Sequence, residues 1–259
     1  MKKPIETFPE AFSIEGQTAL VTGGGSGIGF SIAKSLISAG ATVAICGRRK
    51  DVLESAAEKL GGRCHAFQAD VTKTESLPDL LDKVESTAGH LDILVNNAGT
   101  YLRKPALEQT VEEIENILRI HVFASLALSR EAAGRMVPRG RGNIIFIGSI
   151  ATLMALPETI GYSAAKTAVL GATRTLATEW SPHGLRVNLI APGWINTGMA
   201  EEVLAKDPAR REKILSRTPL NSLGLPEDIG WAAVYLCSPA ARFVTGSTLV
   251  VDGGASIGF

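Results

Sequence analysis

The chain has few cysteines and no excess of charge of either sign. Only three of its 259 residues are Cys, at positions 46, 64 and 237. An odd number of widely spaced thiols excludes the disulfide framework of small secreted domains and indicates a reducing compartment. Lys and Arg together number 26, and so do Asp and Glu. With no net charge, the chain offers no overall field that would attract nucleic acid or an anionic membrane.

Long apolar runs are also absent. No segment offers the roughly 20 consecutive apolar residues that cross a bilayer as a helix. Residues 1–6 lack the apolar core of a secretory signal peptide. We therefore expect a cytoplasmic protein with neither a membrane nor a nucleic acid as its partner, and we expect no metal site.

What the chain does contain is a regular alternation of short apolar runs with stretches of helical spacing. Nearly unbroken apolar strands that alternate with helices predict a parallel sheet covered on both faces. The expected fold class is α/β: one Rossmann-like domain over residues 1–259, with a doubly wound parallel sheet of about seven strands and helices on both faces. The predicted strands cover residues 19–22, 42–46, 64–68, 93–96, 143–147, 186–191 and 248–251. The predicted helices lie near residues 28–39, 51–60, 77–88, 111–136, 162–181 and 227–237.

Two stretches depart from this alternation. Residues 1–15 are expected to form an extended N-terminal arm. Residues 193–225 are the least regular long stretch, and we expect a mobile substrate loop there.

A cluster of glycines follows the first predicted strand. Thr22, Gly23, Gly27 and Gly29 form the pattern T-G-x-x-x-G-x-G, and apolar residues at helical spacing come next. Glycine allows so sharp a turn and lets a phosphate approach the backbone without meeting a Cβ. The first amides of the following helix would then face a pyrophosphate, where the helix dipole favours negative charge. The pattern favours a nucleotide site over a glycine-rich surface loop.

The end of the second predicted strand bears on the choice of cofactor. NAD-binding sites usually place an acidic residue about 20 positions past the glycine turn. Here Gly47 takes that position, and Arg48 and Arg49 follow it. Because a guanidinium group binds phosphate oxygens in pairs, these residues suit a 2′-phosphate. We expect NADP to be preferred over NAD; the alternative is an exposed basic loop.

The next two predicted strands end in polar residues at the same edge of the sheet. Asp70 could accept a hydrogen bond from the adenine amino group, or it could cap the turn at Thr72. Residues 96–99, Asn-Asn-Ala-Gly, could line a cofactor crevice and brace the glycine turn, or they could form an ordinary turn.

A tyrosine and a lysine lie on one face of a predicted helix. Tyr162 and Lys166 are four residues apart. A free phenol titrates near pH 10, so a base that works at neutral pH needs a pKa of about 7. We expect the Lys166 ammonium, helped by the positive charge of a nicotinamide, to lower the tyrosine pKa. Ser149 ends the fifth predicted strand and could donate to a substrate carbonyl oxygen; a solvated lysine and a turn serine are the alternatives.

Together these motifs resemble the short-chain dehydrogenase/reductase family, in its single-domain branch. The glycine turn, residues 96–99, Ser149, Tyr162-x-x-x-Lys166 and Pro192-Gly193 stand in the order of that family. The resemblance covers nearly the whole chain, and it implies reversible hydride transfer between a nicotinamide and a secondary alcohol or ketone. It implies that Tyr162 is the general acid/base, that Ser149 polarises the reacting carbonyl, and that Lys166 holds the nicotinamide ribose.

The resemblance also assigns the remaining residues of the site. Residues near Pro192 and Thr197 would border the nicotinamide, and Asp70 with Val71 would flank the adenine. The expected cofactor-binding residues are Thr22, Gly23, Gly25, Ser26, Gly27, Ile28, Gly29, Arg48, Arg49, Asp70, Val71, Asn97, Ala98, Gly99, Tyr162, Lys166, Pro192, Gly193, Ile195 and Thr197. The expected substrate-binding residues are Ser149, Ala151, Trp194 and Met199.

One position departs from the family pattern. Members usually have an asparagine in the long helix before the fifth strand, where it helps hold a water that relays protons from the lysine, largely through its backbone carbonyl. This chain has His121 there. We expect His121 to belong to the catalytic group as part of an altered relay; the alternative is a core histidine packed at a helix irregularity.

The substrate is expected to be a sugar acid or polyol. Residues 12–16, 136–142 and 183–185 resemble gluconate 5-dehydrogenases and related enzymes. Arg103 and Lys104 could meet a carboxylate, although exposed charges are often only solvated. One alternative is a 3-oxoacyl-thioester reductase that docks an acyl carrier protein through Arg139 and Arg141. Another, of a different class, is a sensor or scaffold that binds NADP without turnover.

We also expect a homo-oligomer. Members of the family are commonly tetramers or dimers built on the two long helices and the last strand. The apolar faces of residues 111–136 and 162–181 and the tail at residues 253–259 fit such an assembly.

Overall fold

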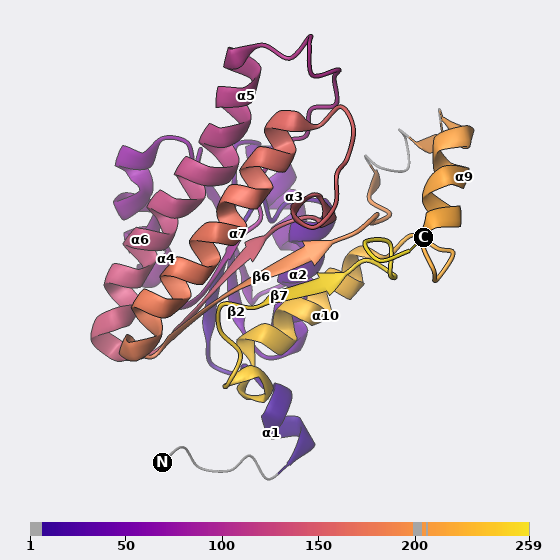
Figure 1. Ribbon diagram of the computed structural model, residues 1–259. Helices are drawn as coiled ribbons and strands as arrows, with labels where there is room; N and C mark the ends of the chain where they lie inside the picture. Colours follow the sequence, from indigo (N-terminus) through magenta and orange to yellow (C-terminus); the bar gives the residue numbers. More distant parts are fainter. Residues whose placement is uncertain (1–6, 199–203, 206, 259) are drawn as a thin grey trace.

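The fold is a single seven-stranded sheet in which every pair of neighbouring strands is parallel. The computed structural model describes residues 7–198, 204–205 and 207–258 (Figure 1). The strand order is β3-β2-β1-β4-β5-β6-β7, so the chain changes direction across the sheet between β1 and β4. The strands are β1 (Thr18–Thr22), β2 (Thr42–Gly47), β3 (Cys64–Gln68), β4 (Leu91–Asn96), β5 (Gly142–Ile147), β6 (Leu185–Pro192) and β7 (Thr248–Val251).

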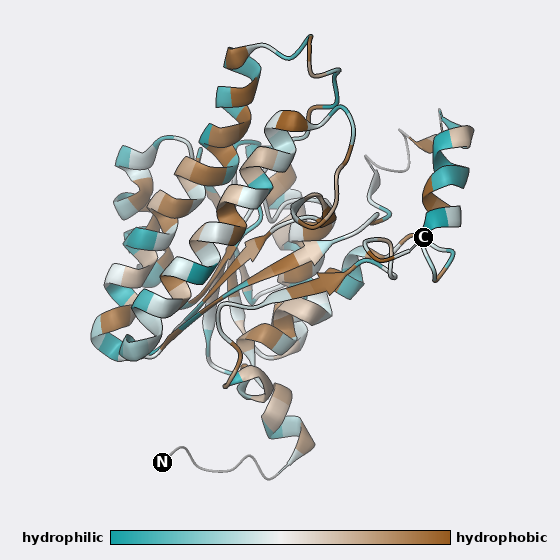
Figure 2. Cartoon of the chain, in the orientation of Figure 1, coloured by the Kyte–Doolittle hydropathy of each residue, from teal (hydrophilic) through white to brown (hydrophobic). Residues whose placement is uncertain are grey.

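Helices cover both faces of the sheet, so the central strands are buried on both sides. All residues of β1 and β4 are buried, which explains the apolar runs at their centres, residues 19–21 and 93–95. Figure 2 shows the apolar residues concentrated in the strands and on the helix sides that meet them. The main helices are α2 (Gly27–Ser38), α3 (Lys50–Leu60), α4 (Leu77–Ala88), α5 (Val111–Leu118), α6 (Ser125–Met136), α7 (Ile160–Trp180) and α10 (Pro226–Cys237).

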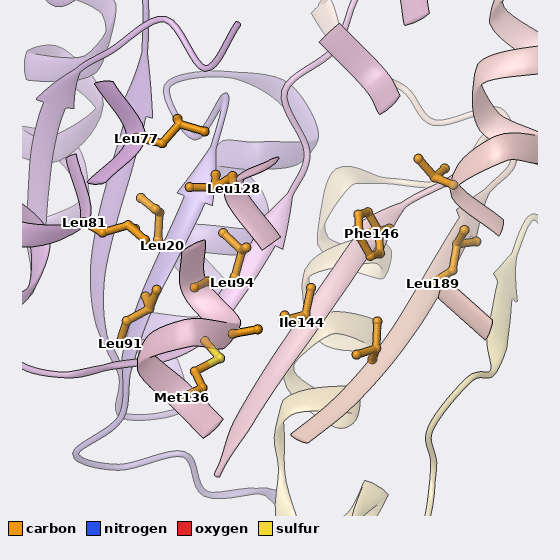
Figure 3. Close-up of a cluster of buried hydrophobic side chains, with 14 of the residues drawn as sticks. Leu20, Leu77, Leu81, Leu91, Leu94, Leu128, Met136, Ile144, Phe146 and Leu189 are labelled. Carbon is orange, nitrogen blue, oxygen red and sulfur yellow. The ribbon is translucent and has the colours of Figure 1, made fainter. Parts of the chain in front are cut away.

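The two faces form two separate hydrophobic clusters. On one face, residues of α4 and α6 pack on residues of the central strands, as Figure 3 shows for Leu81 beside Leu20 and for Met136 near Leu94. On the other face, α2 and α10 pack against one another and on the intervening strand residues, such as Val21. The predicted doubly wound α/β fold is therefore confirmed.

Two stretches that the sequence left without regular structure contain helices. The arm at residues 1–15 contains a short helix, α1 (Phe8–Phe12), whose Phe12 ring contacts Tyr235 of α10 at 6.5 Å. The stretch at residues 193–225 contains α9 (Pro208–Arg217). Asp207 caps α9 by accepting a hydrogen bond from the Arg210 amide at 3.0 Å, and proline follows in the first turn. This Asp-Pro pair is a helix-start signal that the sequence contained.

The predicted helix at residues 111–136 is interrupted. Between α5 and α6 the chain forms a π-helical segment, η2 (Arg119–Ala124), which contains His121. Such segments insert an extra residue into a helical turn and are frequent at functional sites. Among the described residues, no helix is both long and apolar enough to cross a membrane.

Candidate active site

The glycine turn lies between β1 and α2 and is braced from the end of β4. The Thr22 hydroxyl accepts hydrogen bonds from the backbone amides of Asn97 (3.0 Å) and Ala98 (2.9 Å). In return, the Asn97 side-chain amide donates to the Thr22 carbonyl at 2.9 Å. Residues 96–99 therefore brace the glycine turn, as the sequence had suggested.

The turn fits a dinucleotide phosphate. Gly23 and Gly27 have positive φ angles of 66° and 54°, which disfavour any side chain. A Cβ on Gly29 would overlap the Gly23 carbonyl oxygen and the Asn97 amide. The Ser26 side chain makes no capping hydrogen bond, so it leaves the first amides of α2 to an anionic ligand. These residues suit the pyrophosphate of a nicotinamide dinucleotide.

The basic pair after β2 is exposed and available. Arg48 and Arg49 are both exposed, and neither forms an ion pair with another described residue. The Arg48 carbonyl accepts a hydrogen bond from the Gln68 side chain at 3.0 Å, which fixes the backbone there. Asp70 accepts from the Thr72 amide and hydroxyl, so it caps the turn. Burial raises the Asp70 pKa, but those hydrogen bonds and the Arg48 charge outweigh it and keep the pKa below its usual value.

Three side chains of the predicted catalytic group meet at the carboxyl ends of the central strands. Ser149 follows β5 and is buried, and its hydroxyl accepts from the Ala151 amide at 3.1 Å. Tyr162 and Lys166 lie on the first turns of α7, and Tyr162 is hydrogen-bonded to Ser149. The Lys166 ammonium nitrogen lies 5.5 Å from the centre of the Tyr162 ring and donates to the Ile147 carbonyl at 2.6 Å.

The pKa values of this group in the protein alone run against the sequence-based expectation. Burial raises the pKa of Tyr162 to about 12, although the hydrogen bond from Ser149 lowers it. Burial lowers the pKa of Lys166 to about 7. Desolvation thus favours the neutral forms of both side chains. The expected decrease of the tyrosine pKa needs charge beyond that of Lys166.

His121 points into the same group. Its side chain is 6% exposed, and its ring meets the Tyr162 ring edge-on, with centroids 5.5 Å apart. Burial, with a smaller effect of the Lys166 charge, lowers the pKa of His121 to about 3. His121 is therefore neutral at physiological pH. Tyr101 also contacts Tyr162, with ring centroids 5.1 Å apart.

The neutral, buried His121 makes the fold sensitive to acid. Between pH 6.5 and about 3 the unfolded chain binds a proton that the folded chain does not, so stability falls as the pH falls. At about 1.4 kcal/mol for each pKa unit, lowering the pH from 7 to 5 costs about 2 kcal/mol through this residue. We expect His121→Gln to reduce the loss of unfolding free energy over that range by this amount, measured by urea denaturation. The exposed His183→Gln is the control, and equal losses in the His121 variant and the wild type would contradict the prediction.

The segment after β6 returns over the glycine turn. A Cβ on Gly27 would lie 3.6 Å from Cγ2 of Thr197. Gly193 donates to the Val251 carbonyl at 2.9 Å, and Ile195 pairs with Gly224. The segment therefore lies at the carboxyl ends of the strands, the same side of the sheet as the glycine turn. Its predicted cofactor-binding residues are Pro192, Gly193, Ile195 and Thr197. Met199 lies outside the described residues.

The two basic residues that could meet a substrate carboxylate are already paired with acidic side chains. Arg103 forms an ion pair with Glu158, and Lys104 forms one with Glu113 at 3.1 Å. The exception is Arg210, whose guanidinium group stacks on Trp194 at 5.6 Å and has no ion-pair partner among the described residues. No sequence motif indicated this contact, because it joins two distant parts of an irregular stretch.

A parallel sheet with this order, the glycine turn, and the Ser149, Tyr162 and Lys166 group define a short-chain dehydrogenase/reductase, and the chain belongs to that family. A family model described as enoyl-(acyl carrier protein) reductase matches residues 23–256. The predicted family is thereby confirmed.

Individual relatives share nearly the whole length of the chain. The gluconate 5-dehydrogenase of Gluconobacter oxydans is 38% identical over 252 residues, 96% of this chain and 98% of the relative. The 2-dehydro-3-deoxy-D-gluconate 5-dehydrogenase of Escherichia coli is 36% identical, over 94% of this chain and 97% of the relative. A crystal structure of a gluconate 5-dehydrogenase from Burkholderia cenocepacia, in complex with NADP and tartrate, superposes with a TM-score of 0.92 at 31% identity, covering 97% and 99% of the two chains.

Proposed function

We propose that the protein is an NADP(H)-dependent dehydrogenase that interconverts a secondary alcohol and a ketone on a sugar acid or polyol. The observation that carries this proposal is the placement of Ser149, Tyr162 and Lys166 beside a glycine turn that fits a dinucleotide. The similarity to sugar-acid dehydrogenases over nearly the whole chain supports the substrate class.

Each residue of the group has a distinct part in this proposal. A nicotinamide held at this site would supply or accept the hydride. The Tyr162 hydroxyl gives a proton to the ketone oxygen or takes one from the alcohol oxygen. The Ser149 hydroxyl donates a hydrogen bond to the same oxygen. Lys166 would hold the ribose hydroxyls of the nicotinamide half, and its charge together with that of the nicotinamide would lower the phenol pKa. Thr22, Gly23 and Gly29 would hold the pyrophosphate.

The preference for NADP rests on Arg48 and Arg49. We expect Arg48→Ser to raise the KM for NADPH about 10-fold and to leave that for NADH within twofold, because a charge-assisted hydrogen bond contributes about 1.5–3 kcal/mol. Initial rates with each cofactor measure the effect. Lys59→Ser, at the far end of α3, is the control. Equal weakening of both cofactors would contradict a role for Arg48 at the 2′-phosphate.

A substrate panel tests the proposed function. Rates with NADPH and NADH are compared across keto sugar acids, polyol-derived ketones, small diketones and 3-oxoacyl thioesters. Turnover of keto sugar acids supports the proposal, and turnover of thioesters alone overturns it.

The carrier-protein alternative is weakened by the structure, since Arg139 and Arg141 both pair with buried Asp92 at the opposite end of β4. NADPH binding without any turnover would favour the sensor.

We extend the proposal to the substrate loop and the assembly. Residues 193–225 would close over the substrate, with Trp194 and Ala151 lining its site. Exposed apolar side chains at Phe123 (61%), Phe243 (100%) and Ile257 (87%) support a homo-oligomer built on the long helices and the last strand. Light scattering measures its copy number. All three cysteines are free and buried, which suits the reducing cytoplasm.

A further inference from the structure

The ring of His121 fills a space that only a glycine leaves open. His121 lies in η2, where the helix is widened by one residue. A Cβ added to Gly99 would overlap the imidazole ring. The ring is therefore packed directly on the backbone that follows β4.

The same ring is hydrogen-bonded to that backbone. Nε2 of His121 lies 2.7 Å from the Thr100 carbonyl oxygen and 3.1 Å from the Thr100 amide nitrogen. One neutral ring nitrogen cannot donate and accept at once. The shorter contact selects the tautomer in which Nε2–H donates to the carbonyl. His121 thus ties η2 to the loop at residues 98–101.

This loop carries Tyr101 onto the catalytic tyrosine. The rings of Tyr101 and Tyr162 meet at 80°, and those of His121 and Tyr162 meet at 88°. Both are edge-to-face contacts, which fix a ring more sharply than general apolar packing does. The Tyr162 ring thus contacts two rings, and these two are joined to each other through Thr100.

We propose that His121 is a positioning residue for Tyr162: by clamping Thr100 it places Tyr101, so that the two rings together hold the Tyr162 hydroxyl toward Ser149. This inference rests on the proposed function, because it assigns a role in the same reaction. It replaces the proton relay that the sequence suggested for His121.

The contacts favour a clamp over a relay. A relay needs a ring nitrogen that exchanges protons with water or with a neighbouring base. Nε2 is engaged by Thr100, and the side chain is buried. The charged group that faces the ring is Lys166, whose ammonium donates to the Ile147 carbonyl.

A conservative variant separates the two roles. In His121→Gln the side-chain amide can donate to the Thr100 carbonyl from nearly the same place as Nε2, but it cannot pass protons. We expect this variant to keep kcat within about threefold and an unchanged pH profile of kcat. We expect His121→Ala to lower kcat about 10-fold or more, with KM and the Kd for NADPH nearly unchanged. A loss in His121→Gln as large as in His121→Ala overturns the clamp. His183→Gln, on the surface, is the control.

A double-mutant cycle tests the path through Thr100. If His121 acts by placing Tyr101, the effects of His121→Ala and Tyr101→Leu on kcat are coupled, and the double variant is little worse than the more severe single one. If the kcat of the double variant instead falls by the product of the two single effects, the path through Thr100 is wrong.

A measurement that needs no substrate separates a failure of the clamp from a failure of the proposed function. ¹⁵N NMR of the histidine-labelled wild-type protein should show a neutral ring with hydrogen on Nε2 that does not titrate between pH 5 and 9. A ring that titrates in this range, or carries its hydrogen on Nδ1, overturns the clamp. If the NMR result is as expected and no ketone is turned over, the proposed function fails while the clamp stands.

Discussion

Replacing Tyr162 with Phe is expected to lower kcat by about 1,000-fold while changing the Kd for NADPH less than threefold. The variant loses the hydroxyl that Ser149 meets and keeps the ring that Tyr101 and His121 contact. General acid/base groups contribute about 10²- to 10⁴-fold to enzymatic rates. Because the phenyl ring preserves the packing, the loss should fall on kcat and leave cofactor binding intact. NADPH absorbance measures turnover, and NADPH fluorescence measures binding.

The control variant removes a tyrosine hydroxyl outside the candidate site. Tyr235→Phe in α10 takes away a hydroxyl while keeping the ring beside Phe12, and we expect unchanged kinetics. If Tyr162→Phe keeps more than a tenth of the wild-type kcat, Tyr162 is not the acid/base. If it loses turnover and retains NADPH, the sensor alternative is eliminated.

Under the proposed function, the raised pKa of Tyr162 gives the cofactor a part in the acid/base chemistry. A phenol whose pKa is about 12 is a proton donor at pH 7 and needs about 7 kcal/mol of preferential stabilisation to act as a base there. Lys166 cannot provide this alone, because burial lowers its own pKa to about 7. A positive nicotinamide ring would add the missing charge at the moment when alcohol oxidation needs a base.

Three elements have the bounds that the sequence predicted, although none of them is uniformly buried. The predicted bounds of β3, β7 and α4 match the structure at both ends. Strands buried on both faces show as unbroken apolar runs, and the glycine turn is a local pattern, so neighbouring residues were enough to find both. The short helix α1 was missed because its contacts lie with α10, far along the chain.

The structure brings predicted members of the candidate site together through contacts that the sequence did not reveal. Tyr162 and Lys166 stand out by helical spacing, yet the hydrogen bond of Lys166 to Ile147 joins α7 to β5 and has no signature in sequence. The same holds for His121, whose partner Thr100 is 21 residues away and is met through backbone atoms. Burial also reversed the direction of the Tyr162 pKa, because desolvation depends on packing that spacing does not reveal.

Replacing Gly29 with Ala is expected to abolish the cofactor site. The added methyl group would overlap the Gly23 carbonyl oxygen and the Asn97 side-chain amide, so either the turn or the brace from β4 must move. Neither group is the flexible end of a long side chain, since Asn97 is held by its hydrogen bond to Thr22. Overpacking of this kind costs about 1–3 kcal/mol of stability, and a displaced turn no longer aims its amides at a pyrophosphate.

We expect Gly29→Ala to weaken NADPH binding at least about 100-fold, measured by fluorescence titration, and to lower the unfolding free energy by up to about 3 kcal/mol. Gly62→Ala is the matched control, because a Cβ there meets no atom within 4 Å. Urea denaturation of both variants separates a displaced turn from an unfolded protein. A folded Gly29→Ala protein that binds NADPH as the wild type does would show that the cofactor lies elsewhere, and the enzymatic proposal would lose its foundation.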